Sequence, residues 1–256
     1  MEIVVTGAAG NVGRQALDAF DGHDVTAVTH RDHDDVESEV LEIEDREAVR
    51  EVVAGHDVVV HLAANPNPSA DWDDVVGPNI EGTYNVYAAA VESGVDRVVF
   101  ASTNHVHQSH VYDGEHDVES LPDRPEPIAA DDQFRPDSFY GVSKVTGEAL
   151  GSFHADRDGI EVVNLRIGWL LSRDELRERQ AEGGKVAQFA RAIWLSPEDC
   201  RRGIRKAATE PITENPLSAN LVSGNPENYF SLVEARCGFG YHPEDDAADV
   251  VDADGP

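Results

Sequence analysis

Cysteine and long apolar runs are scarce in this chain of 256 residues. The two cysteines, Cys200 and Cys237, are too few for a disulfide framework and form no metal-binding cluster. No apolar stretch approaches the roughly 18 residues that a membrane-spanning helix needs. A strand expected at residues 2–6 leaves no room for a signal peptide. We therefore expect a cytoplasmic protein without a membrane partner.

Basic residues are also few, with 20 against 50 acidic ones and a formal net charge of −30. Because apolar residues recur periodically throughout, we assign this charge to the surface of a folded protein and not to a disordered chain. Such a shell resembles that of halophilic proteins, which stay soluble in high salt; the alternative is an ordinary acidic protein. The charge argues against nucleic acid as a partner, since phosphate backbones require a basic face. It does not exclude acidic small ligands, because a pocket can differ in sign from the whole surface.

Strand and helix patterns alternate along the first two thirds of the chain. Short β-branched runs predict strands, and the amphipathic segments between them predict helices. The predicted strands cover 2–6, 24–30, 57–64, 97–103 and 160–168, and the predicted helices cover 11–20, 45–54, 80–94 and 139–158. This order predicts an α/β fold of the Rossmann type, a doubly wound parallel sheet with helices on both faces.

The alternation breaks at residues 107–137, which carry four prolines and no sustained periodicity. This composition predicts a long loop, and such loops within compact domains are often functional. The histidines of residues 105–116 lack the spacing of metal ligands, so we expect no metal site. Farther along, the sequence predicts a helical segment at 173–193 broken at Gly183 and Gly184, a helix at 196–210, a short strand at 220–225 and a frayed acidic tail from about residue 244.

The stretch VVTGAAGNVG at residues 4–13 places Gly7, Gly10 and Gly13 between the first predicted strand and the first predicted helix. Its first glycine interval is one residue longer than that of the dinucleotide fingerprint. The N-terminus of a helix offers free N–H groups and a partial positive charge, and glycine allows the backbone to approach a phosphate closely. We interpret this stretch as the seat of a pyrophosphate; the alternative is a glycine-rich turn without a ligand.

Tyr140 and Lys144 are four residues apart on a predicted helix and therefore share one face. A free tyrosine titrates near 10, too high for a base at neutral pH. A lysine ammonium, together with a positively charged nicotinamide, is expected to lower the pKa of Tyr140. The alternative is a chance surface pair, but Lys144 is one of only three lysines, and arginine would not be an equally compact donor.

Four motifs taken together resemble the extended short-chain dehydrogenase/reductase family over nearly the whole chain. They are TGAAGNVG at 6–13, HLAA at 61–64, STNH at 102–105 and YGVSK at 140–144. The resemblance implies a dinucleotide-binding domain at 1–168 and a small substrate lobe at 169–256 that also supplies a returning helix and the last strand. It implies NAD or NADP as cofactor and a homodimer.

The same resemblance implies roles for individual residues. Tyr140 would be the acid/base, Lys144 would bind the nicotinamide ribose and tune Tyr140, and Thr103 would hydrogen-bond the substrate oxygen. Asn79 would support the active site, although it could equally cap the helix that begins at Ile80. Implied cofactor contacts are Gly7, Ala9, Gly10, Asn11, Val12, Gly13, Glu42, Ile43, Leu62, Ala63, Ala64, Asn79, Tyr140, Lys144 and Ile167.

Within that family, ASTNH at 101–105, FYGVSKVTGE at 139–148, NLRIG at 164–168 and IWLSPED at 193–199 resemble sugar dehydrogenases. Those enzymes oxidise C1 of a uronic acid or of glucose 6-phosphate to a lactone and pass a hydride to the nicotinamide. Asn104 and His105 would then contact other sugar hydroxyls, or His105 is a packed loop residue. Two alternatives remain: a nucleotide-sugar epimerase or dehydratase, and a non-catalytic NADP-sensing regulator.

The chain departs from this pattern where the resemblance implies an arginine for the acidic end of the sugar. Phe189 stands at the aligned position. Arg191, Arg173 or Arg166 could bind a carboxylate or phosphate instead, but each could equally form an ion pair. The sequence therefore leaves the substrate open between a uronate, an aldose and a sugar phosphate.

A second departure concerns the end of the second predicted strand, which reads Thr29-His30-Arg31. NAD enzymes of this fold place an acid there, whereas an arginine accommodates the 2′-phosphate of NADP. His30 and Arg31 therefore favour NADP, although the resemblance to the sugar dehydrogenases favours NAD.

Overall fold

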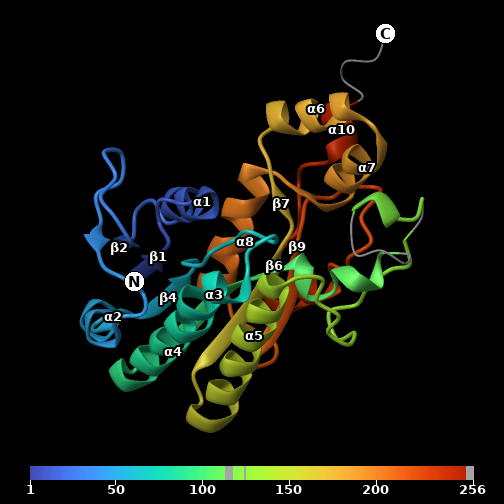
Figure 1. Ribbon diagram of the computed structural model, residues 1–256. Helices are drawn as coiled ribbons and strands as arrows, with labels where there is room; N and C mark the ends of the chain where they lie inside the picture. The colour runs from blue at the N-terminus through green and yellow to red at the C-terminus, as the bar shows by residue number, and fades with distance from the viewer. Residues whose placement is uncertain (113–117, 124, 252–256) are drawn as a thin grey trace.

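The computed structural model describes residues 1–112, 118–123 and 125–251, and its centre is a seven-stranded sheet (Figure 1). The strands run parallel in the order β3-β2-β1-β4-β5-β6-β9. Their bounds are β1 Glu2–Thr6, β2 Asp24–Thr29, β3 Glu39–Val40, β4 Val58–His61, β5 Arg97–Thr103, β6 Glu161–Ile167 and β9 Leu217–Leu221. The order reverses direction between β1 and β4, as in doubly wound folds. The expected Rossmann-type sheet is thus confirmed.

Helices cover both faces of this sheet, namely α1 Asn11–Ala19, α2 Arg46–Val53, α4 Gly82–Ser93, α5 Phe139–Asp158, α8 Pro197–Thr209 and α9 Val233–Phe239. The other helices are α3 Trp72–Val75, α6 Arg173–Glu182, α7 Gly184–Ile193 and α10 Ala247–Val251. A six-residue π-helix, η1 Val76–Glu81, runs directly into α4, and short 3₁₀ turns occupy η2 Asn104–Val106, η3 Gln108–His110 and η4 Val118–Ser120.

The two faces follow from the alternation of side chains along each strand. In β1, Ile3 and Val5 pack on one face with Phe20, the residue after α1, and with Ile204 of α8. Val4 points to the other face, where α2, α4 and α5 pack. Figure 1 shows these three helices together on one side of the sheet and α1 and α8 on the other. Because both faces are covered, the strands can be almost continuously apolar. These apolar runs are the signal from which the sequence predicted the strands.

The described residues differ from the sequence predictions mainly in short elements. The two-residue strand β3 and helix α9 are too short to produce a periodic pattern, and β9 begins at Leu217 instead of residue 220. The segment 107–137 is irregular, as expected, apart from the turns η3 and η4; its residues 113–117 and 124 lie outside the described residues. The predicted helix break at Gly183 separates α6 from α7.

The acidic tail is a correction to the sequence analysis. Residues 247–251 are not frayed but form α10, whose Ala247 and Val250 are buried against α6 and α7. The Asp199 carboxylate accepts the backbone N–H groups of Glu244 and Asp245 at 2.9 and 3.1 Å, which anchors the segment ahead of α10. The sequence analysis missed this helix because its two buried apolar residues, Ala247 and Val250, lie among many acidic residues. The last five residues of the predicted tail lie outside the described residues.

Beside the main sheet, α6, α7 and α10 form a lobe with a two-stranded ladder of β7 Trp169–Leu170 and β8 Trp194–Leu195 (Figure 1). The chain then returns through α8 and β9 to the main sheet. Among the described residues, no helix is both long and apolar enough to cross a membrane.

Candidate active site

The carboxyl ends of β1, β4, β5 and β6 meet at one edge of the sheet, which is where ligands bind in open α/β folds. Gly7 follows β1, the HLAA segment ends β4, Thr103 ends β5 and Ile167 ends β6. The fold therefore brings three of the four sequence motifs, which are far apart in the chain, to a common edge, while the fourth, YGVSK, lies on helix α5.

The glycine turn is shaped for close backbone approach. Gly7 has a φ of +69°, and a Cβ there would lie 2.7 Å from the backbone N of Ala63. A Cβ on Gly13 would lie 2.2 Å from the carbonyl oxygen of Gly7. Side chains are excluded at both positions, so the turn is held against the end of β4 and against the first turn of α1.

Helix α1 also begins without a side-chain cap. Gly10 is its N-cap and offers no side-chain acceptor, whereas α2, α5, α6 and α8 begin with capping side chains from Asp45, Ser138, Ser172 and Ser196. The first N–H groups of α1, around Asn11, Val12 and Gly13, therefore lack a side-chain acceptor. This arrangement fits a pyrophosphate, and Gly7 to Gly13 are the residues that would hold it.

At the end of β2, His30 and Arg31 are exposed. The Thr29 hydroxyl donates to the carbonyl oxygen of Arg31 at 2.8 Å and lies 2.7 Å from the Ser38 hydroxyl, which fixes the turn. Among the described residues, no ion pair engages the Arg31 guanidinium. Glu42 is likewise exposed, while Ile43 is buried against α4.

Thr103, Tyr140 and Lys144 come together beneath this edge. Thr103 is 4% exposed at the end of β5, and Lys144 is 2% exposed on α5, one turn after Tyr140. The Lys144 Nζ lies 5.9 Å from the centre of the Tyr140 ring and 4.8 Å from that of Phe100. Thr103 and Lys144 are thus shielded from water, whereas Tyr140 is partly exposed.

Burial governs the protonation of this group. It raises the pKa of Tyr140 to about 12, against a smaller lowering by the Thr103 hydroxyl. Burial likewise lowers the pKa of Lys144 to about 7. The expected lowering of the Tyr140 pKa by Lys144 together with a bound nicotinamide concerns the loaded site and stays a prediction.

His105 is oriented by a carboxylate that the sequence analysis missed. Its Nδ1 lies 2.9 Å from both carboxylate oxygens of Asp137, and its ring contacts the Tyr140 ring edge-on, with centroids 5.7 Å apart. Asn104 is buried, and its amide donates to the Gln108 side chain at 2.8 Å. Asp137 lies two residues before the predicted helix, in a loop whose path no local pattern fixes.

Asn79 lies inside the π-helix η1 and is fully buried, so the helix-cap interpretation is wrong. Its Oδ1 accepts the N–H of Asn65 at 2.7 Å, and its Nδ2 donates to the carbonyl of Asn65 at 3.0 Å and to the Ser143 hydroxyl at 2.9 Å. Asn79 thus ties the end of the HLAA segment to helix α5. π-Helical turns of this kind often mark functional sites.

The three candidate arginines are all engaged by carboxylates. Arg166 is 3% exposed and makes a two-pronged pair with Glu148, at 2.9 and 2.8 Å. Arg191 pairs with Glu227 at 2.7 Å, and Arg173 pairs with Asp245. Arg166 is thereby placed in the interior and forms an ion pair, the alternative to substrate binding that the sequence analysis left open.

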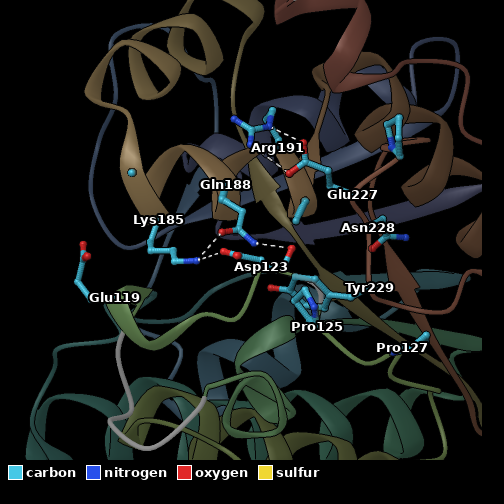
Figure 2. A pocket seen from close by; sticks show the side chains of 13 residues that line it. Glu119, Asp123, Pro125, Pro127, Lys185, Gln188, Arg191, Glu227, Asn228 and Tyr229 are labelled. Carbon is cyan, nitrogen blue, oxygen red and sulfur yellow. Dashed lines mark hydrogen bonds and ion pairs between the residues drawn. The ribbon is translucent and has the colours of Figure 1, made fainter.

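A pocket of about 740 Å³ lies between the segment 119–127, helix α7 and residues 226–229 (Figure 2). Figure 2 shows Lys185 reaching Asp123 on one side and Arg191 reaching Glu227 on the other. Tyr229, which lines this pocket, links the pocket to the end of β5. The Gln108 amide donates to the Tyr229 hydroxyl at 3.4 Å, and Gln108 also accepts from Asn104, which follows β5. No cluster of three or more metal-ligating side chains occurs among the described residues.

Comparison with known proteins confirms the family resemblance. The family model described as NAD dependent epimerase/dehydratase family matches residues 3–200. L-arabinose 1-dehydrogenase (NAD(P)(+)) of Haloferax volcanii is 52% identical over 251 residues, covering 98% of this chain and 99% of that protein. NAD-dependent glucose-6-phosphate dehydrogenase of the same organism is 33% identical over 267 residues, covering 97% and 95%.

Solved structures show the same similarity. Uronate dehydrogenase from Agrobacterium tumefaciens has a TM-score of 0.80 at 26% identity, covering 100% of this chain and 90% of that one. A mutant of that enzyme complexed with NAD has a TM-score of 0.78 at 25% identity, with the same coverage. Because the family match spans well over half of the chain, the protein belongs to the NAD dependent epimerase/dehydratase family.

Proposed function

We propose that this protein is an oxidoreductase that transfers a hydride from C1 of a neutral aldose to NAD or NADP and forms a lactone. The observation that carries the proposal is the grouping of Thr103, Tyr140 and Lys144 beside the glycine turn. The similarity to L-arabinose 1-dehydrogenase over almost the whole of both chains supports the same reaction class.

The chain's own residues provide binding and proton transfer. The Thr103 hydroxyl donates a hydrogen bond to the C1 oxygen, and Tyr140, as the phenolate, takes the proton of the C1 hydroxyl as the C1–H bond breaks. The bound nicotinamide supplies the hydride acceptor and a positive charge. Lys144 lies on the same face as Tyr140 and supplies a second positive charge when protonated, which stabilises the phenolate that burial otherwise disfavours.

Several features support a neutral sugar over a uronate or a sugar phosphate. Phe189 on α7 stands where an arginine is expected and packs against Trp169, with ring centroids 6.0 Å apart. The nearby pocket includes Glu119, Asp123 and Glu227, and its Lys185 and Arg191 are already paired with two of these acids. Among the described residues of this pocket, both cations are paired with acids, whereas Glu119 has no ion-pair partner. Arg124 lies outside the described residues.

The test is a substrate panel in high salt. Purified protein is assayed for nicotinamide reduction with L-arabinose, with a uronate and with glucose 6-phosphate, each with NAD and with NADP. We expect kcat/KM for the neutral pentose to exceed that for either acid by at least about a hundredfold, since a charged group without a partner costs several kcal/mol. Preferential oxidation of the uronate or the phosphate would contradict the neutral-sugar proposal.

For the cofactor, we propose that NADP binds at least as well as NAD. Arg31 is exposed, lies directly after β2 and has no ion-pair partner among the described residues. Its guanidinium is suited to a 2′-phosphate. Arg31→Ala is expected to weaken NADP binding about tenfold and NAD binding by less than threefold, as a loss of one charge-assisted contact implies. Equal weakening of both cofactors would sink this proposal.

We further propose a homodimer built on α4 and α5. Exposed apolar side chains gather on these helices and the adjoining α3, namely Trp72, Tyr84, Phe139, Val142 and Phe153. The rings of Trp72 and Phe139 touch, with centroids 5.9 Å apart. Light scattering after size exclusion should give twice the monomer mass, and Phe153→Asp should shift it to the monomer; a monomeric parent protein would rule the dimer out.

We also propose a cytoplasmic location in a salt-rich cell, for which the high negative charge is the support. We retain the division into a dinucleotide-binding domain at 1–168 and a substrate lobe at 169–256 as part of this proposal, since α6, α7 and the pocket lie in the second segment.

A further inference from the structure

A line of buried hydrogen bonds joins the glycine turn to the helix that carries Tyr140. It starts at Thr6, the residue before Gly7, and passes through His61 at the end of β4 to Thr83 on α4. Thr6 is 1% exposed, and His61 and Thr83 are fully buried. None of these three side chains touches the sugar-binding residues proposed above, so the proposed reaction leaves them without a role.

The first half of the line has a fixed direction. The Thr6 hydroxyl oxygen accepts the backbone N–H groups of Leu62 and Ala63, each at 3.2 Å. Because its oxygen already accepts two donors, its own proton is directed to the Nδ1 of His61, 2.7 Å away. The contact with Ala63 also holds the strand end against Gly7, where no side chain would fit.

The second half agrees with this direction. The Thr83 hydroxyl donates to the carbonyl oxygen of Asn79 at 2.7 Å, so its oxygen accepts the Nε2–H of His61 at 3.1 Å. Only the neutral imidazole with its proton on Nε2 satisfies both neighbours. Burial, together with the charge of Lys144, lowers the pKa of His61 to about 3 and keeps the ring neutral.

The line ends at the catalytic helix. The amide of Asn79 donates to the Ser143 hydroxyl at 2.9 Å, and that hydroxyl donates to the carbonyl oxygen of Tyr140 at 2.7 Å. The π-helical turn around Asn79 allows its carbonyl to receive Thr83 while its side chain reaches α5. The links from Thr6 through His61, Thr83 and Asn79 to Ser143 are buried, so water does not compete for them, and the last link, to the Tyr140 carbonyl, is partly buried.

We propose that His61 is a positioning residue that sets helix α5 against the glycine turn, so that Tyr140 and a cofactor held by that turn meet in the correct register. The proposal rests on the proposed cofactor site. It predicts that weakening a link distant from both ligands changes cofactor binding and turnover together. A histidine that merely fills the core would change only the stability of the protein.

The sharpest test uses Thr83, which touches His61 but belongs to neither ligand site. Thr83→Val keeps the shape and removes the hydroxyl, which leaves the Nε2–H of His61 without its acceptor and takes one donor from the Asn79 carbonyl. Thr83→Ser is the matched control, since it keeps the hydroxyl and removes the methyl group. For Thr83→Val we expect about a tenfold lower kcat and about a fivefold weaker binding of the reduced cofactor, as loss of one buried hydrogen bond implies.

Thr83→Ser should retain both quantities within about twofold, and the KM for the sugar should not change in either variant, because Thr103 and His105 lie outside the line. Cofactor binding is measured by fluorescence titration with NADH or NADPH and needs no sugar. Wild-type binding and turnover in Thr83→Val would overturn the proposal. So would an equal loss in Thr83→Ser, which would assign the effect to packing of the methyl group.

Nitrogen-15 NMR of the histidines in the cofactor-free protein provides an independent readout. We expect His61 to be neutral with its proton on Nε2 between pH 5 and pH 9, and a proton on Nδ1 would contradict the direction of the line. If no sugar is oxidised by any variant but cofactor binding follows the predicted Thr83 pattern, the proposed substrate fails and the role of His61 stands.

Discussion

At the scale of single residues, burial is the property that separates the catalytic group from an ordinary surface pair. The sequence predicts that Tyr140 and Lys144 share a helix face, but it does not predict that Lys144 is only 2% exposed. The burial of each side chain shifts its own pKa, to about 12 for Tyr140 and about 7 for Lys144. The proposed reaction therefore requires positive charge next to the Tyr140 oxygen in the loaded site.

Tyr140→Phe removes the hydroxyl that takes the proton and leaves the ring in place. We expect kcat to fall by about 10³-fold or more, within the range that acid–base groups supply. Binding of NADH or NADPH should change by less than about threefold, because the glycine turn and Lys144 remain. Initial rates and a fluorescence titration measure the two quantities. Retained turnover would remove Tyr140 from the reaction.

At the scale of elements, helix α5 is attached to the sheet by a buried ion pair one turn beyond Lys144. Glu148 and Arg166 are each 3% exposed, and the Ser102 hydroxyl donates to Glu148 at 2.5 Å. Arg166 also donates to the carbonyl oxygen of Ala130 at 2.6 Å, which connects the pair to the segment 107–137. The pair thus joins α5, β5, β6 and that segment below the active site.

Glu148→Gln leaves the Arg166 guanidinium buried without a counter-charge. We expect the free energy of unfolding to fall by about 3–5 kcal/mol, the usual result of removing one partner of a buried ion pair. The control is Glu227→Gln, which breaks the half-exposed pair with Arg191 and should cost less than about 1 kcal/mol. Urea unfolding in high salt measures both. Equal losses in the two variants would show that the buried pair contributes no more to the free energy of unfolding than the half-exposed pair.

The elements that could be predicted from the sequence are those with a strong local signal. The strands at the centre of the sheet and the long helices α4 and α5 have enough periodicity or apolar composition to be recognised. Gly94, the last residue of the predicted helix 80–94, follows α4 in the left-handed conformation. The tail helix α10 was missed because only Ala247 and Val250 carry its apolar face. Asp137 and Glu148 were missed as site residues because their partners, His105 and Arg166, are distant in the sequence.

At the scale of the whole molecule, the net charge of −30 is spread over a surface whose arginines are largely paired with acids. The charge could be read from composition, but the neutralisation of each candidate substrate arginine could not, since it depends on which carboxylates the fold brings close. This is why sequence reasoning left the substrate open and why the paired arginines favour a neutral sugar.

Mutual repulsion of the surface carboxylates should make stability strongly salt-dependent. Raising KCl from about 0.15 M to about 1 M shortens the screening length from about 8 Å to about 3 Å. We expect Tm to rise by about 10 °C, which corresponds to about 3 kcal/mol for a chain of this length. Thermal unfolding followed by circular dichroism measures this. A Tm that is flat or falls with KCl would contradict the halophilic interpretation.

The most direct test of the central claim is isotope transfer from C1. The protein is incubated with NAD or NADP and L-arabinose carrying deuterium at C1, and the products are examined by mass spectrometry and NMR. The account predicts that the reduced nicotinamide carries the deuterium and that the first sugar product is the lactone. Oxidised sugar whose deuterium remains at C1, or recovery of an epimerised sugar with no net reduction of the nicotinamide, would contradict it.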